Sequence, residues 1–301
     1  MKKDTEKPKI LVVVGPTASG KTGLAIELAK RFNGEVISAD SRQVYRGLDI
    51  GTAKTTKEEM DGIPHYLIDI AEPKEVYNAA DFKRDAGVAI KNIISRGKLP
   101  IVCGGTFFYV DVLLGRINLP DVEPNETLRK KLEEKSAAEL YAELALKDPR
   151  RAADIDPQNK RRLIRALEIA REIDYVPLST KLDSPYQYFL VGIEVGKEEL
   201  RERFAKRAKD WLVRGFLKEI ETVLKSGVTM ERLEEIGFEY KLGLELLAKK
   251  IDEQGFIQKF MEKNWQYAKR QMRWLKRDKE IVWFKRNDPK IFETVRNFLE
   301  K

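Results

Sequence analysis

The chain has 301 residues, and its 57 Lys and Arg against 49 Asp and Glu give a formal net charge of +8. This length allows two domains or one core with an insertion, and the basic excess favours nucleic acid as a partner over a merely solvated lysine-rich surface. A single cysteine, Cys103, excludes an internal disulfide and a multi-cysteine metal site. The charged start and the short apolar run after it match neither a secretory signal nor a membrane span. We therefore expect a cytoplasmic protein with no membrane partner.

The first motif follows the apolar run at residues 10–14. It reads Gly15-Pro16-Thr17-Ala18-Ser19-Gly20-Lys21-Thr22 and matches the phosphate-binding pattern G-x-x-x-x-G-K-S/T. An apolar run, a glycine loop and a helical pattern in this order direct backbone N–H groups and the helix dipole at one anion. We expect residues 15–22 to bind a polyphosphate, with Lys21 reaching its outer oxygens and the Thr22 hydroxyl binding Mg²⁺.

Strand and helix patterns alternate after this loop. Residues 35–38 and 99–103 have the pattern of short buried strands, and residues 79–96 between them have helical spacing. Such units predict an α/β fold with a parallel-sheet core. Because ligands of parallel sheets bind at the carboxyl edge, the phosphate loop, Asp40 and Thr106 are predicted to share one site.

The middle of the chain has a different pattern. Residues 124–148 have helical spacing, a basic helix follows at 158–168, and no strand pattern occurs before 188–195. We therefore expect a mainly helical insertion at 118–195, between a first part of the core at 1–117 and a second part at 196–301. The second part is predicted to contain helices at 197–225, 236–250 and 254–277 and a strand at 281–284.

Seven segments in one order extend over nearly the whole chain. They are GPTASGKT (15–22), DSRQVYRGLDIGTAK (40–54), GIPHYLIDI (62–70), YNAADF (77–82), GGTFFYV (104–110), RRLIRALE (161–168) and YAKRQ (267–271). Together they resemble the tRNA dimethylallyltransferases, also called tRNA isopentenyltransferases. The resemblance implies transfer of a dimethylallyl group from dimethylallyl diphosphate to tRNA, with release of pyrophosphate. The acceptor would be the exocyclic amine of the adenosine immediately 3′ of the anticodon, in the anticodon stem-loop. We expect the chain to act as a monomer.

The phosphate loop then becomes the site of the leaving group. An allylic diphosphate ionises toward a carbocation while negative charge gathers on pyrophosphate, which N–H dipoles, Lys21 and Mg²⁺ stabilise. Thr17 is similar to the family threonine that hydrogen-bonds the bridging oxygen, and Arg207 matches the family arginine that contacts pyrophosphate. Arg203 lies four residues earlier on the same predicted helix, so it either faces the same ligand or belongs to a solvated basic face.

Two roles are open for Asp40. An adenine amine is a poor nucleophile because its lone pair is delocalised, so a carboxylate that accepts its proton would help. An aspartate at the end of a buried strand also binds magnesium in other phosphate-loop enzymes. Similarity to the family's Asp-Ser motif favours the base, with Ser41, Arg42 and Gln43 beside the target nucleotide.

Basic helices mark the predicted RNA surface. A nucleotide base that is paired or stacked in the anticodon arm must be flipped out before it can react. Thr106 is expected to line the channel that receives this base, to cap the helix after the double glycine, or to do both. A second basic cluster lies at residues 269–277. Phosphate contact together with aromatic stacking is typical of RNA loops. The predicted tRNA-binding residues of the insertion are Arg161, Arg162, Leu163, Ile164 and Arg165.

One segment departs from the family pattern. Glu239, in Ile236-Gly237-Phe238-Glu239, stands where the family usually has a basic residue near the RNA, so that contact is not carried over. Three other functions compete with the main interpretation. They are a phosphate-loop kinase for small molecules, an isopentenyltransferase for free adenine nucleotides, and an RNA-binding module that only senses a nucleotide.

Overall fold

The computed structural model describes residues 7–176 and 183–301. It divides the chain into two compact units. The larger unit comprises Met1–Leu114 and Ser184–Lys301, and the smaller unit comprises Gly115–Asp183.

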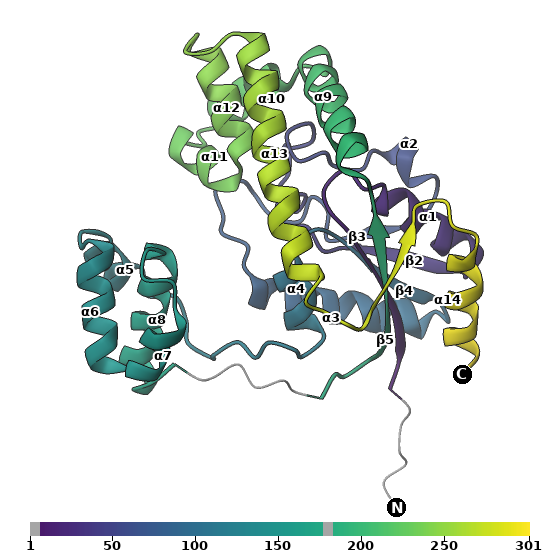
Figure 1. Cartoon of the computed structure of the whole chain (residues 1–301), viewed down its shortest axis with the longest axis horizontal. Coiled ribbons are helices and arrows are strands. Elements are labelled where there is room, and N and C mark those ends of the chain that lie inside the picture. Colours follow the sequence, from purple (N-terminus) through teal and green to yellow (C-terminus); the bar gives the residue numbers. More distant parts are fainter. Residues whose placement is uncertain (1–6, 177–182) are drawn as a thin grey trace, which may run out of the picture. The chain divides into compact units, whose positions relative to one another are not determined.

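A six-stranded sheet forms the centre of the larger unit (Figure 1). The strands are β1 (Lys9–Val14), β2 (Gly34–Ser38), β3 (His65–Tyr66), β4 (Leu99–Cys103), β5 (Gln187–Glu194) and β6 (Ile281–Lys285). Their order across the sheet is β3-β2-β4-β1-β5-β6, and every neighbouring pair is parallel. Val12 of β1 is in register with Val102 on one side and Leu190 on the other. The predicted α/β fold with a parallel sheet is confirmed.

Helices cover both faces of this sheet. The continuous apolar run of β1 is typical of a strand buried on two sides, and its residues from Ile10 to Val14 are at most 1% exposed. The helices α1 (Lys21–Arg31) and α14 (Lys290–Glu300) share one apolar cluster with alternate residues of the strands. The helix α3 (Ala79–Ser95) packs against β2 and β4 from the opposite face. Two short helices are α2 (Lys57–Met60) and α4 (Phe107–Leu113).

Five further helices lie beyond the carboxyl edge of the sheet (Figure 1). They are α9 (Lys197–Arg214), α10 (Phe216–Lys225), α11 (Met230–Ile236), α12 (Phe238–Leu247) and α13 (Glu253–Leu275). The single helix predicted for residues 197–225 is wrong, because Gly215 adopts a φ of 94° and separates α9 from α10. The helix α11 was not predicted. Trp211, Phe216, Tyr240 and Phe260 of these helices form an apolar cluster that also includes Leu48 of the segment after β2.

The smaller unit is helical over its described residues. It contains α5 (Glu126–Glu133), α6 (Ala137–Lys147), α7 (Pro149–Asp154) and α8 (Lys160–Ile173) around fully buried leucines such as Leu140 and Leu163. The insertion was predicted to extend to residue 195, whereas the structure places the boundary at Asp183. The reason is that β5, which was included in the predicted insertion, pairs with β1 and belongs to the larger unit.

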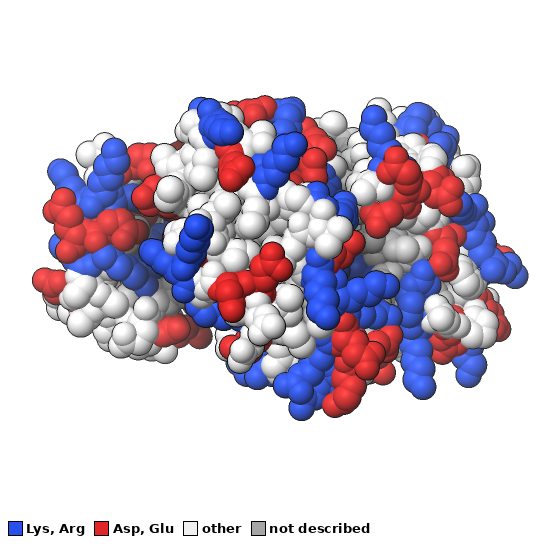
Figure 2. Space-filling view, turned by 90° about the horizontal axis from the view of Figure 1, so that it is seen from above, with Lys and Arg blue, Asp and Glu red and all other residues white. Residues whose placement is uncertain are grey.

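The surface carries both signs of charge. In Figure 2, Lys and Arg side chains are mixed with Asp and Glu over the face shown, so the net charge of +8 is not gathered there into one basic patch. Among residues 7–176 and 183–301, no helix combines the length and the apolar composition that crossing a membrane requires.

Candidate active site

A cavity of about 670 Å³ lies in the larger unit at the carboxyl edge of the sheet. Its wall contains the phosphate loop, part of the segment after β2, and the Gly104-Gly105 turn after β4. The helices α9, α12 and α13 contribute further side chains. Strand ends and helices far apart in the sequence therefore meet around one space.

The phosphate loop is shaped by its glycines. Gly20 has a φ of 86° directly before α1, and a Cβ at Gly15 would lie 2.8 Å from Ser19 Oγ and 3.2 Å from the Ile193 carbonyl oxygen. No side chain caps the N-terminus of α1, so its first N–H groups remain available to an anion. Pro16 accepts a hydrogen bond from the Ser19 N–H over 3.1 Å, which closes the loop.

Lys21 lies among ionisable neighbours at the floor of the cavity. Burial lowers the pKa of Lys21, Cys103 and Asp40 act in the opposite direction, and Arg207 adds to the decrease. Burial also raises the pKa of the Cys103 thiol to about 11, so the thiol stays protonated. These couplings indicate that Lys21, Asp40 and Arg207 act on one another across the cavity.

Two arginines of α9 face the loop. Arg207 Nη1 donates to Thr17 Oγ1 over 3.2 Å, and Arg203 Nη1 donates to the Ala18 carbonyl oxygen over 2.6 Å. Burial lowers the pKa of Arg207, and the proximity of Arg203 acts in the same direction. The guanidinium of Arg203 thus contacts the phosphate loop with one nitrogen and pairs with the exposed Glu199 through another.

Asp40 follows β2 and lines the cavity. Its Oδ1 accepts the N–H groups of Arg42 over 2.9 Å and Gln43 over 3.4 Å. Within the described residues, its other oxygen accepts no hydrogen bond. One carboxylate oxygen therefore shapes the local turn, and the second is available to a ligand.

Thr106 joins the turn after β4 to the residue after Asp40. Its Oγ1 accepts the Ser41 N–H over 3.0 Å and lies 3.3 Å from Ser41 Oγ. Although Thr106 occupies the N-cap position of α4, its side chain makes no capping hydrogen bond, so the capping alternative is wrong. Neither Ser41 nor Thr106 lines the cavity, in contrast to Arg42 and Gln43.

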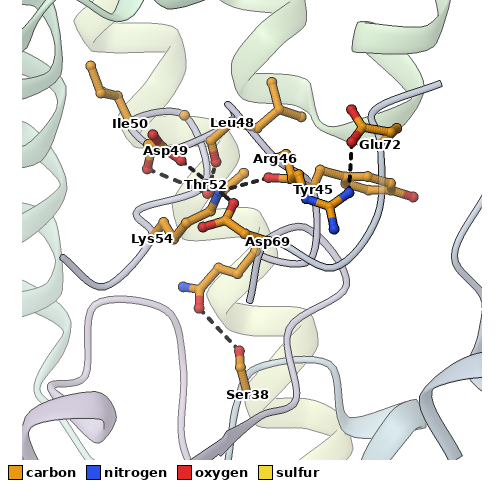
Figure 3. Close-up of polar contacts among 12 residues, drawn as sticks. Ser38, Tyr45, Arg46, Leu48, Asp49, Ile50, Thr52, Lys54, Asp69 and Glu72 are labelled. Carbon is orange, nitrogen blue, oxygen red and sulfur yellow. Dashed lines mark hydrogen bonds and ion pairs between the residues drawn. The ribbon is translucent and has the colours of Figure 1, made fainter. Parts of the chain in front are cut away.

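Polar contacts within the segment from residue 40 to residue 56, and with residues on either side of it, hold this segment in place (Figure 3). Lys54 is buried, and its Nζ donates to the Tyr45 carbonyl oxygen over 2.7 Å and to Asp49 Oδ1 over 2.6 Å. It donates to Asp69 Oδ1 as well. The Gln43 amide is also engaged, because its Oε1 accepts from Ser38 Oγ and its Nε2 donates to the Ala53 carbonyl oxygen. Gln43 therefore shapes the segment before any nucleotide binds.

Arg42 is enclosed by side chains from the C-terminal helices. Its guanidinium pairs with Glu239 and lies 5.7 Å from the ring centroid of Phe238 and 5.5 Å from that of Tyr267. Burial lowers the pKa of Arg42, but Glu239, Tyr267 and Asp40 together outweigh burial and hold the pKa above its ordinary value. Burial raises the pKa of Tyr267 to about 12. The acidic residue that departs from the family pattern is thus the counter-ion of a cavity arginine.

The predicted tRNA-binding helix is α8 of the smaller unit. Arg161 and Arg162 are exposed, whereas Leu163 and Ile164 are 0% and 4% exposed in the core of that unit. The structure therefore does not support a direct RNA contact by either apolar side chain. Arg165 pairs with the buried Glu168 and donates to the Val122 carbonyl oxygen over 2.8 Å, which ties it to the fold.

The residues of the cavity fit a magnesium ion that is coordinated mainly by phosphate oxygens and water, with few protein oxygens. Within the described part of the chain, no group of three or more His, Cys, Asp and Glu could hold a metal on its own. The Thr22 hydroxyl and the Asp40 carboxylate nevertheless line the same cavity. Mg²⁺ in phosphate sites usually takes one or two protein oxygens together with phosphate oxygens and water.

Several residues that line the cavity or contact the phosphate loop have no signal of their own in the sequence. Lys206 and Arg214 of α9 line the wall, and Gln271 of α13 contacts the phosphate loop. Arg286, after β6, donates to the Gly20 carbonyl oxygen over 3.1 Å and pairs with Glu27. Only the fold brings these distant residues to the loop, although the segment that contains Gln271 was noticed through the family resemblance.

This geometry defines a phosphate-loop α/β protein with a basic helix facing the loop. A family model described as IPP transferase matches residues 43–278. A tRNA dimethylallyltransferase of Thermomicrobium roseum is 38% identical over 302 residues, covering 98% of this chain and 92% of that protein. One of Staphylococcus haemolyticus is 40% identical over 295 residues, covering 94% and 88% respectively. The chain belongs to the IPP transferase family, which confirms the resemblance seen in its motifs.

Solved structures agree with this assignment. The full-length tRNA isopentenylpyrophosphate transferase of Bacillus halodurans matches with a TM-score of 0.71 and 37% identity, covering 98% of this chain and 96% of that chain. A eukaryotic dimethylallyltransferase acting on tRNA matches with a TM-score of 0.76 and 28% identity, covering 95% and 76%.

Proposed function

We propose that this enzyme transfers a dimethylallyl group from dimethylallyl diphosphate to the exocyclic amine of the adenosine immediately 3′ of a tRNA anticodon. One observation carries the proposal: a single cavity joins a phosphate loop, an arginine directed at that loop and an aspartate with an available carboxylate oxygen. Prenyl transfer needs these elements together, because a diphosphate must leave while an amine loses a proton. The names of the relatives support the same reaction.

The leaving group is assigned to the phosphate loop. As the allylic C–O bond breaks, negative charge moves onto the diphosphate, and pre-oriented N–H groups and cations stabilise that charge more than they stabilise the substrate. Lys21 and Arg207 supply positive charge, and the Thr17 hydroxyl, held by Arg207 over 3.2 Å, is placed to donate toward the bridging oxygen. Mg²⁺ bound by the Thr22 hydroxyl and phosphate oxygens would add further positive charge.

Asp40 is assigned the task of accepting a proton from the acceptor amine. The new C–N bond forms as the amine attacks the allylic carbon, and a proton must leave the nitrogen for the product to be neutral. A carboxylate within hydrogen-bond reach can accept that proton. We assign this role to the oxygen of Asp40 that accepts no hydrogen bond from the described residues.

The RNA is assigned to basic side chains of both units. Arg161 and Arg162 on α8 are exposed and suited to phosphate contact, and Arg42 stands at the cavity wall near the rings of Phe238 and Tyr267. Aromatic rings and guanidinium groups are the side chains on which unpaired RNA bases stack. The expected partner is the anticodon stem-loop, from which the adenosine is flipped into the cavity.

A labelled-donor assay tests the proposal. The enzyme is incubated with radiolabelled dimethylallyl diphosphate, Mg²⁺ and either unmodified tRNA or AMP, and the label is located after nuclease digestion. We expect label on the adenosine next to the anticodon and none on AMP. Label on AMP alone would assign the enzyme to free nucleotides. Phosphorylated products from ATP without prenyl transfer would indicate a kinase.

A further inference from the structure

A glutamine of α13 bridges two segments of the cavity wall. Gln271 is 5% exposed, and its Oε1 accepts the Thr17 N–H over 2.8 Å. Its Nε2 donates to the Gly105 carbonyl oxygen over 3.0 Å. One side-chain amide therefore joins the phosphate loop to the turn after β4.

The amide has only one orientation that satisfies both partners. The Thr17 N–H requires an acceptor and the Gly105 carbonyl requires a donor, so a flipped amide would lose both hydrogen bonds. The Gln271 amide is packed closely against Gly105, because a Cβ at Gly105 would lie 2.7 Å from Gln271 Nε2. The adjoining Gly104 is equally confined, since its Cβ would lie 2.1 Å from the Ala39 carbonyl oxygen.

We infer that Gln271 is a positioning residue for the diphosphate site, which holds Thr17 at a set distance from the Gly104-Gly105 turn. This inference rests on the proposed function. Because Gln271 occupies the Thr17 N–H, that group is withdrawn from phosphate binding, and the Thr17 side chain is left to act through its hydroxyl. The same hydroxyl accepts from Arg207, so Thr17 is held by one hydrogen bond from α9 and one to α13. Small displacements of a reacting group can cost on the order of 100-fold in rate.

The first test removes both hydrogen bonds with little change in shape. In Gln271→Met we expect kcat to fall by about 10- to 100-fold, with the affinity for tRNA unchanged. The matched control is Asn264→Leu. Asn264 is buried on the same helix, but its amide donates to the Phe260 carbonyl oxygen within that helix and does not line the cavity. We expect this control to keep the parent kcat.

The second test uses pH. In Gln271→Glu the introduced carboxylate can accept from Thr17 but opposes the Gly105 carbonyl oxygen. Once protonated, it both accepts and donates, as the amide does. We therefore expect the kcat of Gln271→Glu, relative to the parent, to rise at least threefold between pH 8 and pH 6. A parent-like kcat in Gln271→Met would overturn the inference.

A binding measurement separates this inference from the proposed function. Titration calorimetry with inorganic pyrophosphate and Mg²⁺ needs no tRNA and no prenyl transfer. We expect Gln271→Met to bind pyrophosphate about 10-fold more weakly than the parent and Asn264→Leu to bind it equally well. If the parent fails to prenylate tRNA but this difference is present, the proposed reaction is wrong and the role of Gln271 in the site stands. Equal pyrophosphate affinity in all three proteins would show that Gln271 does not position the diphosphate site.

Discussion

Arg42 Nη1 donates to Glu239 Oε2 over 2.6 Å at the wall of the cavity. The side chain of Glu239 is only 7% exposed and that of Arg42 23% exposed, so the two charges depend on each other more than a surface pair does. The pair joins the segment after β2 to the start of α12. It therefore links the position of a catalytic-site loop to the packing of the C-terminal helices.

The first prediction concerns this ion pair. Glu239→Gln should lower the free energy of unfolding by about 1 to 3 kcal/mol, because it leaves a buried guanidinium without its counter-ion. Glu234→Gln serves as the control, since Glu234 pairs with Lys241 where both side chains are exposed, and it should cost at most about 0.5 kcal/mol. Urea unfolding measures both. Equal losses would mean that the buried pair contributes no more than a surface one.

The second prediction concerns Asp40. Asp40→Asn is nearly isosteric but cannot take a proton, so single-turnover transfer should slow by about 100-fold or more while tRNA affinity is retained. Pyrophosphate affinity at several Mg²⁺ concentrations separates the two roles of this residue. If Asp40 is the base, Asp40→Asn leaves the affinity for pyrophosphate unchanged. If Asp40 is a ligand of the metal, the substitution weakens that affinity.

The third prediction concerns Arg207. Arg207→Ala should weaken pyrophosphate binding by about 10- to 100-fold, because it removes a charged donor from the site of the leaving group. Arg207→Lys keeps the charge but not the planar fork, so it should recover only part of the loss. Arg201→Ala is the control on the same helix, since Arg201 faces the Trp265 ring at 5.9 Å and does not line the cavity. If Arg207→Ala and Arg201→Ala behave alike in calorimetry, Arg207 does not touch the diphosphate.

The fourth prediction concerns pH. Hydrogen bonds from Arg96 hold the pKa of the buried Glu35 at about 2 against an ordinary value of 4.5, with Lys98 and Tyr66 adding to the effect. A depressed pKa contributes stability that is complete above pH 4.5 and is lost as the pH falls toward 2. Glu35→Gln should therefore be less stable than the parent at pH 7 and pH 5, and the difference should shrink at pH 3. Urea midpoints at the three pH values measure it, with the exposed Glu72 as the control position. A difference that stays constant to pH 3 would contradict this pKa.

The fifth prediction concerns the RNA surface. Replacing Arg161 or Arg162 by Gln should make the log–log salt dependence of tRNA binding shallower by about 0.7 to 0.9 for each phosphate contact removed. Turnover at saturating tRNA should be unchanged, because phosphate contacts position the RNA. Arg165→Gln should instead lower the stability of the smaller unit, since Arg165 is paired with the buried Glu168. Unchanged slopes would direct the search to Lys269 and Arg270.

The sheet was predictable because its strands are local patterns. The apolar runs that became β1 and β4 are buried on both faces, and such runs can be recognised without knowing their neighbours. Breaks between helices were harder to predict from the sequence. Gly215 ends α9 in a left-handed conformation, but a glycine within a helical pattern does not by itself distinguish a break from a tolerated residue.

Residues of the site could be predicted where they belong to one sequence motif. Residues that only the folded chain brings to the site could not. The phosphate loop and Asp40 were found from short segments, whereas the contacts of Gln271 and Arg286 with the loop span more than half of the chain. The family motif also misled in α8, where Leu163 and Ile164 belong to the motif but face the core. A motif identifies a segment, and only packing decides which of its side chains reach the solvent.

The position of β5 beside β1 has a consequence for biosynthesis. β1 leaves the ribosome early, but the strand that pairs with it begins only at Gln187, and the side chains that hold the phosphate loop, from Arg203 to Arg286, follow later still. Contacts at such separation form slowly, because a long loop must close before they are made. A nascent chain that ends before β5 therefore carries the complete glycine motif and still lacks the side chains that hold this loop in the folded protein.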